Sequence, residues 1–78
     1  MAAVELFPGV ISDPDLLGGE ATIKDTRIPV SLIVGHLSSG MRLEELLDEY
    51  DLTQEQVRTA LGYAKHLLEE KQPHATRP

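Results

Sequence analysis

The chain has 78 residues, no cysteine and a formal net charge of −6. This length suffices for one small domain, and the lack of cysteine excludes disulfides, thiolate metal sites and cysteine nucleophiles. Hydrophobic residues make up 41% of the chain, and its aromatic residues are two Tyr and one Phe. This composition favours a mainly helical fold, because strands usually draw on more aromatic side chains. No stretch is apolar enough to cross a membrane or to direct export, so we expect a cytoplasmic protein.

The first residues are predicted to hold little regular structure. Residues 1–9 are expected to form a flexible arm, because Pro8-Gly9 interrupts them. Asp13-Pro14-Asp15 predicts a turn, and Gly18-Gly19 is expected to reverse the chain through positive φ angles. A single folded domain is therefore predicted over residues 10–71.

A β-hairpin is predicted over residues 21–30. Thr22-Ile23 and Arg27-Ile28 flank a short polar run that suits a tight turn. Pro29 has no backbone donor, so this ribbon has to lie at the edge of a sheet. An isolated hairpin is marginal in water, and we expect it to pack on helices or on a second copy of the chain.

Two short helices are predicted next, over about residues 31–39 and 42–50. Gly40 is placed to end the first of them as a left-handed residue. In the second, an apolar side is formed by residues at i, i+3, i+4 and i+7, opposite four acids. Arg42 is a poor N-cap, which predicts a weak start for this helix. The apolar side comprises Leu43, Leu46, Leu47 and Tyr50.

A longer helix is predicted over about residues 54–70. Thr53 followed by Gln56 has the pattern of a capping box. Gly62 costs helix stability, and either a close approach by another backbone or plain sequence drift would explain it. The two prolines of residues 72–78 predict a disordered tail. The expected packing stripe of this helix comprises Val57, Ala60, Leu61, Ala64, Leu67 and Leu68.

Catalysis and metal binding have little support in the sequence. His36, His66 and His74 lie far apart in sequence, and they form no pattern that is typical of a metal site. We therefore expect no enzyme activity, no metal and no cofactor. The acids of the second helix are interpreted as a solvated face, with a partner-binding surface as the alternative.

Nucleic-acid binding fits better, because a short helix, a tight link and a longer helix match the helix-turn-helix plan. Gln pairs well with adenine and Arg with guanine in the major groove. The alternative is that this helix only packs, with its polar side in water, and the net negative charge opposes binding to phosphates. The candidate DNA-binding residues are Gln54, Gln56, Arg58, Thr59 and Tyr63.

Arginines are the candidate contacts to an acidic partner. Arg27 lies beside the predicted hairpin turn, where it either forms an ion pair that holds the hairpin or contacts a partner through its guanidinium. Arg58 and Arg77 are the other candidates, and the sequence does not rank the three.

Several segments together resemble the family catalogued as domain of unknown function 433, over about residues 10–70. The most specific is the run from Thr26 to Val30 after the Gly18-Gly19 turn. Two positions differ from the family pattern: Asp25 stands where Gly is usual, and Arg42 stands where Ser or Thr is frequent. The remaining matching segments are Ile11 to Pro14, Ile23 to Asp25, Ser39 to Met41, Glu44 to Leu47 and Leu52-Thr53.

The resemblance implies a homeodomain-like or winged helix-turn-helix fold after the hairpin. It also implies an antitoxin of a type II toxin–antitoxin system, which neutralises a PIN-like ribonuclease toxin and represses its own operon by binding operator DNA. A homodimer is expected, since small domains gain stability by association. The alternative is a protein-interaction module with no role at DNA, which the charge of −6 favours.

Overall fold

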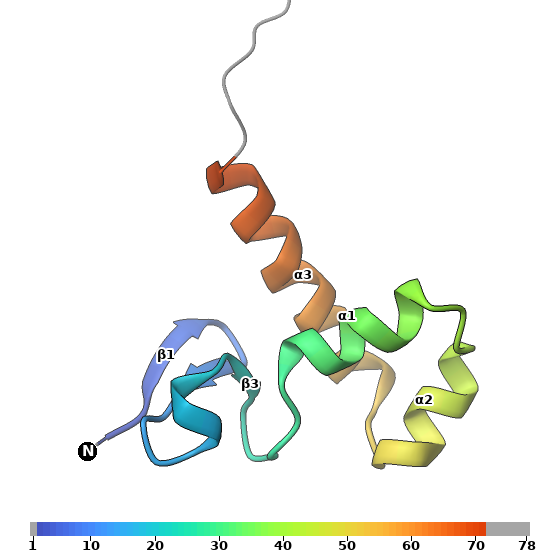
Figure 1. Cartoon of the computed structure of the whole chain (residues 1–78), viewed down its shortest axis with the longest axis horizontal. Helices are drawn as coiled ribbons and strands as arrows, with labels where there is room; N and C mark the ends of the chain where they lie inside the picture. The colour runs from blue at the N-terminus through green and yellow to red at the C-terminus, as the bar shows by residue number, and fades with distance from the viewer. Residues whose placement is uncertain (1, 72–78) are drawn as a thin grey trace, which may run out of the picture.

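The computed structural model describes residues 2–71 as a three-stranded antiparallel sheet followed by three helices (Figure 1). The strands, in the spatial order β1-β2-β3, are β1 (Val4–Phe7), β2 (Val10–Ser12) and β3 (Thr22–Ile23). The helices are α1 (Val30–Ser38), α2 (Leu43–Tyr50) and α3 (Gln54–Lys71), and a short 3-10 turn covers Leu17–Gly19. The predicted order of β-structure and then three helices is confirmed, with mixed α/β content.

The arm predicted over residues 1–9 is wrong for residues 4–7, which form the edge strand β1. Val4 pairs with Ser12 and Phe7 with Val10, around a bulge. Pro8-Gly9 is the turn of a hairpin and does not mark the end of a loose arm. The strand is held in place because the ring of Phe7 packs on α3, with its centroid 5.7 Å from that of Tyr63.

The hairpin predicted over residues 21–30 is present only in part. Its first limb is β3, which pairs mainly with β2, and its second limb touches β3 through a single bridge from Thr22 to Pro29. Backbone bonds of 3.0 Å from Ile23 to Ile28 and 2.9 Å from Val30 to Ala21 close the loop. The second limb stays irregular because the chain enters α1 immediately after Pro29.

Asp25 occupies a left-handed conformation in this loop, with φ of 65°. Glycine takes this conformation without strain, whereas other L-residues are disfavoured there. We expect Asp25→Gly to raise the free energy of unfolding by about 0.5 to 1 kcal/mol. The measurement is a urea titration followed by circular dichroism. Lys24→Gly, next to it at an ordinary φ, is the control and should lower stability; a gain in both variants would contradict this explanation.

The helix ends follow the predicted signals. Gly40 is left-handed, with φ of 101°, just after α1. The Thr53 backbone N–H donates to Oε1 of Gln56 at 2.9 Å, and the Gln56 N–H donates to Oγ1 of Thr53 at 3.1 Å, which confirms the capping box. The expected weak start of α2 is offset by Glu45, whose carboxylate accepts a hydrogen bond from the Arg42 backbone N–H at 3.1 Å.

The core lies where the sheet, α1 and the first half of α3 meet. Each of the three helices contributes to it, and α2 does so through Leu46 alone. His36 of α1 and Tyr50 of α2 join those two helices by a hydrogen bond of 2.9 Å between Nε2 and the hydroxyl. The buried core residues are Val10, Ile23, Val30, Ile33, Leu46, Leu52, Val57 and Ala60.

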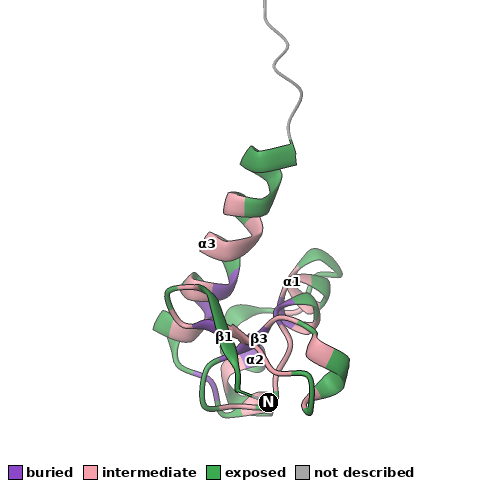
Figure 2. Cartoon of the chain, turned by 90° about the vertical axis from the view of Figure 1, so that its left-hand side faces the viewer, coloured by how far each residue is buried: buried purple, intermediate pink, exposed green. Residues whose placement is uncertain are grey.

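The predicted packing stripe of α3 is buried only in its first half. Val57 and Ala60 are in the core, but Leu61, Leu67 and Leu68 are 44%, 38% and 71% exposed. Figure 2 shows buried residues in the lower turns of α3 and mainly exposed residues in the upper turns, which extend beyond the other elements. The prediction that this whole stripe packs inside the domain is therefore wrong, because the helix is longer than the body that it covers.

Gly62 also differs from expectation. A β-carbon at this position would lie 3.4 Å from Cζ of Phe7, so the small residue makes room for an aromatic ring. Of the two explanations, a close approach by another backbone is wrong, because the neighbour is a side chain. The residue that occupies the space comes from β1, the strand that the sequence patterns did not predict.

Candidate functional site

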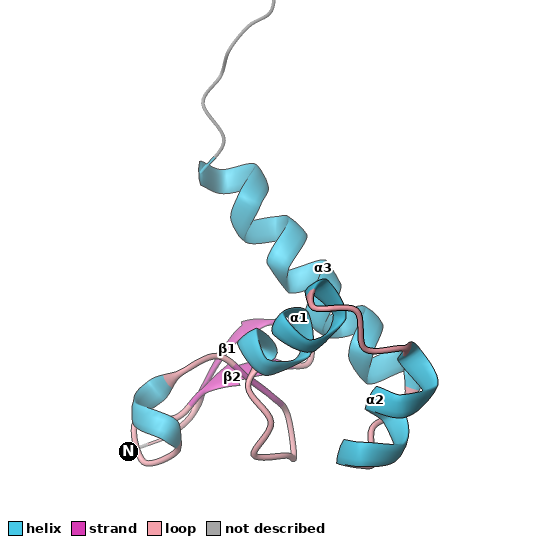
Figure 3. Cartoon of the chain, turned by 45° about the vertical axis from the view of Figure 1, so that its right-hand side comes forward, coloured by secondary structure: helices cyan, strands magenta, loops and turns pink. Residues whose placement is uncertain are grey.

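The three helices form an open groove of about 270 Å³ on their outer side. Its place follows from local structure: the turn after α1 and the cap of α3 bring the three helices around one hollow, as Figure 3 shows for the helices themselves. We call it the leucine groove, and its lining residues are Leu37, Leu43, Gln54, Val57, Arg58 and Leu61.

The leucine groove combines exposed apolar side chains with one cation. Leu43 is 36% exposed and Leu61 is 44% exposed, although both carry large aliphatic side chains. Arg58 is the charged residue among those that line the groove, and it is itself exposed. Such a surface suits an apolar side chain that enters the groove and a carboxylate that meets the guanidinium beside it.

Gln54 and Arg58 are the two DNA-binding candidates that stay free on the surface of α3. Both are exposed and four residues apart, so they lie on one side of the helix above the leucine groove. The other glutamine, Gln56, is committed to the helix cap, since its side-chain oxygen accepts the Thr53 backbone N–H.

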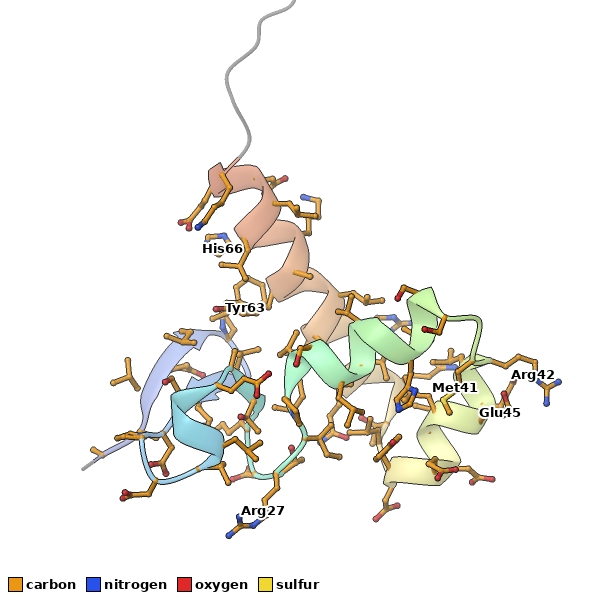
Figure 4. All side chains as sticks on the ribbon, in the orientation of Figure 1. Arg27, Met41, Arg42, Glu45, Tyr63 and His66 are labelled. Carbon is orange, nitrogen blue, oxygen red and sulfur yellow. The ribbon has the colours of Figure 1, made fainter. Side chains whose placement is uncertain are left out.

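The remaining two candidates, Thr59 and Tyr63, lie on the side of α3 that meets the sheet. A β-carbon on Gly9 would stand 2.9 Å from Cγ2 of Thr59, which places that side chain directly against the β1–β2 turn. Tyr63 stacks at an angle on Phe7, and Figure 4 shows Tyr63 and His66 on the side of α3 toward β1. The five residues therefore do not form one face, and the structure brings together only Gln54 and Arg58.

The arginine candidates are also separated by the fold. Arg27 is exposed and points away from the body in Figure 4. Within residues 2–71 it forms no ion pair, and the loop is instead held by Thr26, whose hydroxyl donates to the Ile23 carbonyl at 2.8 Å and accepts from the Ile28 N–H at 3.0 Å. Arg77 lies outside the described residues. Arg58 is the arginine that adjoins a groove.

The acidic side of α2 lies in water next to the leucine groove. Its four acids are all exposed, and Arg42 Nε approaches the carboxylate of Glu45 at 3.8 Å (Figure 4). This surface repels phosphate and attracts basic groups of a partner. The acids are Glu44, Glu45, Asp48 and Glu49.

The sequence patterns did not identify the apolar part of this site. Leu37, Leu43 and Leu61 all fall on helix sides that periodicity assigns to the core, and only the arrangement of the three helices leaves them accessible. Within the described part of the chain, no three His, Asp or Glu residues come together as a metal site. No helix among residues 2–71 is both long and apolar enough to pass through a membrane.

Comparison with known proteins gives a consistent family. The model of the family described as protein of unknown function (DUF433) matches residues 10–64. The uncharacterized protein y4eO of Sinorhizobium fredii is 35% identical over 57 residues, which are 72% of this chain and 26% of that protein. The chain thus spans about a quarter of the length of y4eO.

A solved structure has the same fold. The crystal structure of a DUF433 member protein from Anabaena variabilis has a TM-score of 0.72 and 35% sequence identity to this chain. The similarity covers 80% of this chain and 62% of that one. Because the family model matches most of the chain, and a family member shares its fold, the chain belongs to the DUF433 family of proteins of unknown function.

Proposed function

We propose that this protein is the antitoxin of a type II toxin–antitoxin pair and that it neutralises a PIN-like ribonuclease by direct contact. The toxin class comes from the family resemblance alone. The contact itself is supported by one observation, the leucine groove with its accessible apolar floor and Arg58 beside it. The proposal places this contact in the cytoplasm, where toxin and antitoxin meet.

The leucine groove suits a protein partner better than a nucleic acid. Its lining is apolar except for Gln54 and Arg58, and the adjoining side of α2 carries four acids. Apolar anchors surrounded by charge are typical of the energetic centre of protein interfaces. In the proposed complex, an aliphatic or aromatic side chain of the toxin enters between Leu43 and Leu61, and Arg58 binds a carboxylate of its acidic centre.

Operator binding is the second part of the proposal, with α1 to α3 acting as a homeodomain-like helix-turn-helix unit. The observation that favours it is the exposure of Gln54 and Arg58 on the first turns of α3, directly after the short link from α2. A dimer would present two such helices to successive major grooves and double the positive contacts. An interaction module without DNA binding is the alternative outcome of the experiments below.

The groove is tested by calorimetric titration of the protein with the product of the neighbouring gene. We expect Leu43→Lys to weaken binding by at least about thirtyfold, because a buried anchor is typically worth 2 kcal/mol or more. Arg58→Ala is expected to weaken it by about tenfold, through the lost charge-assisted bonds. Leu6→Lys on β1, where the leucine is 40% exposed, is the matched control and should bind like the unmodified protein.

Unchanged affinity of Leu43→Lys, in a variant with normal helix content, would remove the groove from the proposal. A gel shift with the upstream promoter tests the DNA part, with the protein alone and with its toxin. Binding should fall with salt and with Gln54→Ala. No shift in either state leaves the interaction module as the function.

A further inference from the structure

A second hollow, of about 290 Å³, lies along the same junction between α1 and α3 as the leucine groove. The leucine groove is lined by the end of α1 and the first half of α3, whereas this hollow is lined by the first half of α1 and the second half of α3. We call it the Glu20 hollow, after the charged residue in its lining. Its apolar lining consists of Ala21, Val30, Val34, Ala64 and Leu67.

The two hollows follow one another through a pair of neighbouring residues on each helix. On α3, Leu61 of the leucine groove and Ala64 of the Glu20 hollow are three residues apart, as are Leu37 and Val34 on α1. Residues at this spacing are neighbours on the helix surface, with about 5 to 6 Å between their β-carbons. The hollows therefore form one apolar track along the two helices, which we call the junction track.

The junction track has opposite charges at its two ends. Arg58 is the charged residue that lines the leucine groove, and Glu20 is the charged residue that lines the other hollow. Both are exposed, and within residues 2–71 neither forms an ion pair. Glu20 Oε2 accepts a hydrogen bond from the Ser31 hydroxyl at 2.5 Å. Because an ionised carboxylate accepts several bonds, Glu20 can bind a cation while it keeps this contact.

The positions of the two charges set the length of a complementary segment. Glu20 is held at Ser31, and Leu37 lines the groove beside Arg58. Ser31 and Leu37 lie six positions apart on α1, which is a rise of about 9 Å. An α-helix rises about 10 Å in seven residues. A helix laid along the junction track therefore meets both charges when its own acid and base are about two turns apart, with apolar residues between them.

The two signs of charge disfavour nucleic acid as the ligand of the whole track. A phosphate backbone is attracted by Arg58 but repelled by Glu20. An amphipathic protein helix satisfies both ends, because it can carry either charge and packs its apolar side into a groove.

We propose that the junction track binds an amphipathic helix of a partner protein, which places an acid at Arg58, apolar side chains in the two hollows and a base at Glu20. Each charge of the track then faces its opposite, and a helix that carries the same charge at both positions meets one repulsion. This binding mode deepens the proposed function, because the leucine groove is one half of the track. It rests on that function only for the identity of the partner as the toxin.

Three synthetic peptides test the track without any toxin. Each is an alanine-rich helix of about 17 residues with leucines in the middle. Its two charged positions, about seven residues apart, carry Glu and Arg, Glu and Glu, or Arg and Arg. In a titration followed by NMR of the protein's backbone amides, we expect the peptide with Glu and Arg to bind about tenfold more tightly than either of the others. Its binding should shift the amides of both hollows together, those of Leu37 and Leu61 with those of Val34 and Ala64.

Charge variants of the protein provide a stricter test with the same peptides. Glu20→Arg makes both ends of the track positive and should prefer the peptide with two Glu, whereas Arg58→Glu should prefer the peptide with two Arg. Asp15→Arg, at an exposed residue away from the track, is the matched control and should keep the original preference. Circular dichroism of each variant checks that it is folded. Equal affinities for the three peptides, no binding of any of them, amide shifts confined to one hollow, or a preference that does not follow the variants would overturn the proposal.

Calorimetric titration with the product of the neighbouring gene separates this binding mode from the proposed function. We expect Glu20→Arg to weaken that binding by about tenfold and Asp15→Arg to leave it unchanged. If Leu43→Lys weakens binding and Glu20→Arg does not, the leucine groove remains the toxin site and the junction track is overturned. If the peptides bind as expected and the gene product does not bind, the junction track stands and the proposed function fails.

Discussion

Leu46→Ala is expected to lower the free energy of unfolding by about 3 kcal/mol, the cost of a buried leucine together with the cavity that it leaves. Leu46 is fully buried, and it is the one buried residue of α2. The other seven residues of this helix are exposed or half-buried, and Leu47 and Tyr50 pack against the core only in part. Leu46 is therefore the largest single contribution of α2 to the core. A domain of this size has a total stability of roughly 5 to 10 kcal/mol, so the loss is a large fraction of it.

The prediction is measured by urea unfolding at one fixed protein concentration, because association makes stability depend on concentration. Leu43→Ala is the matched control: it is the same substitution one turn earlier on α2, at a leucine that is 36% exposed. We expect it to cost less than about 1 kcal/mol. Similar losses of unfolding free energy in Leu46→Ala and Leu43→Ala would mean that α2 does not pack through Leu46.

Gly9→Ala is expected to lower the free energy of unfolding by about 2 to 3 kcal/mol, for two reasons that add. Gly9 has φ of +88°, where an alanine is strained by about 1 to 2 kcal/mol. Its new β-carbon would also stand 2.9 Å from Cγ2 of Thr59, whose β-branched side chain has two χ1 rotamers available on a helix and so can move away only by leaving its present one. The turn is fixed from the other side, since the Gly9 carbonyl accepts the Lys24 N–H at 2.9 Å.

Gly18→Ala separates the two contributions. Gly18 has φ of +66°, but a β-carbon there would meet nothing within 4 Å, so only the backbone strain applies, at about 1 kcal/mol. Thermal or urea unfolding of both variants measures the difference. Adding Thr59→Ser to Gly9→Ala removes the opposing methyl group and should restore part of the loss. Equal losses of unfolding free energy in Gly9→Ala and Gly18→Ala would show that the β1–β2 turn does not contact α3 closely. The same would follow if adding Thr59→Ser recovered none of the loss.

The helices were predictable because their signals are local. Periodicity and caps placed all three within one residue of their observed bounds, and the Thr53–Gln56 capping box forms as expected. The strands were harder to predict, because their formation depends on residues that are distant in sequence. The apolar runs around Pro8-Gly9 are too short to mark a hairpin without the partner that covers them, and that partner is the α3 surface around Gly62, more than fifty residues away in sequence.

The candidate site was likewise predictable only in part. Gln54 and Arg58 were identified from residue type and place on the helix, and they do lie on the surface. Gln56, Thr59 and Tyr63 were named with them, but their side chains are occupied by the cap, the β1–β2 turn and Phe7. Residue type alone does not distinguish a polar side chain in water from one already engaged by a distant strand.

The amino-acid sequence by itself determined the three helices, the cap of α3, the left-handed residue after α1 and the acidic side of α2, because each depends on residues within one or two turns of one another. It also determined the family, through short segments spread over residues 10–64. Tertiary structure decided which apolar residues are buried. The helical stripe of α3 is continuous in sequence, yet α1 and the sheet cover only its first half, and α1 with α2 leaves Leu43 and Leu61 open. Burial depends on what stands opposite a side chain, and that is a property of the whole fold.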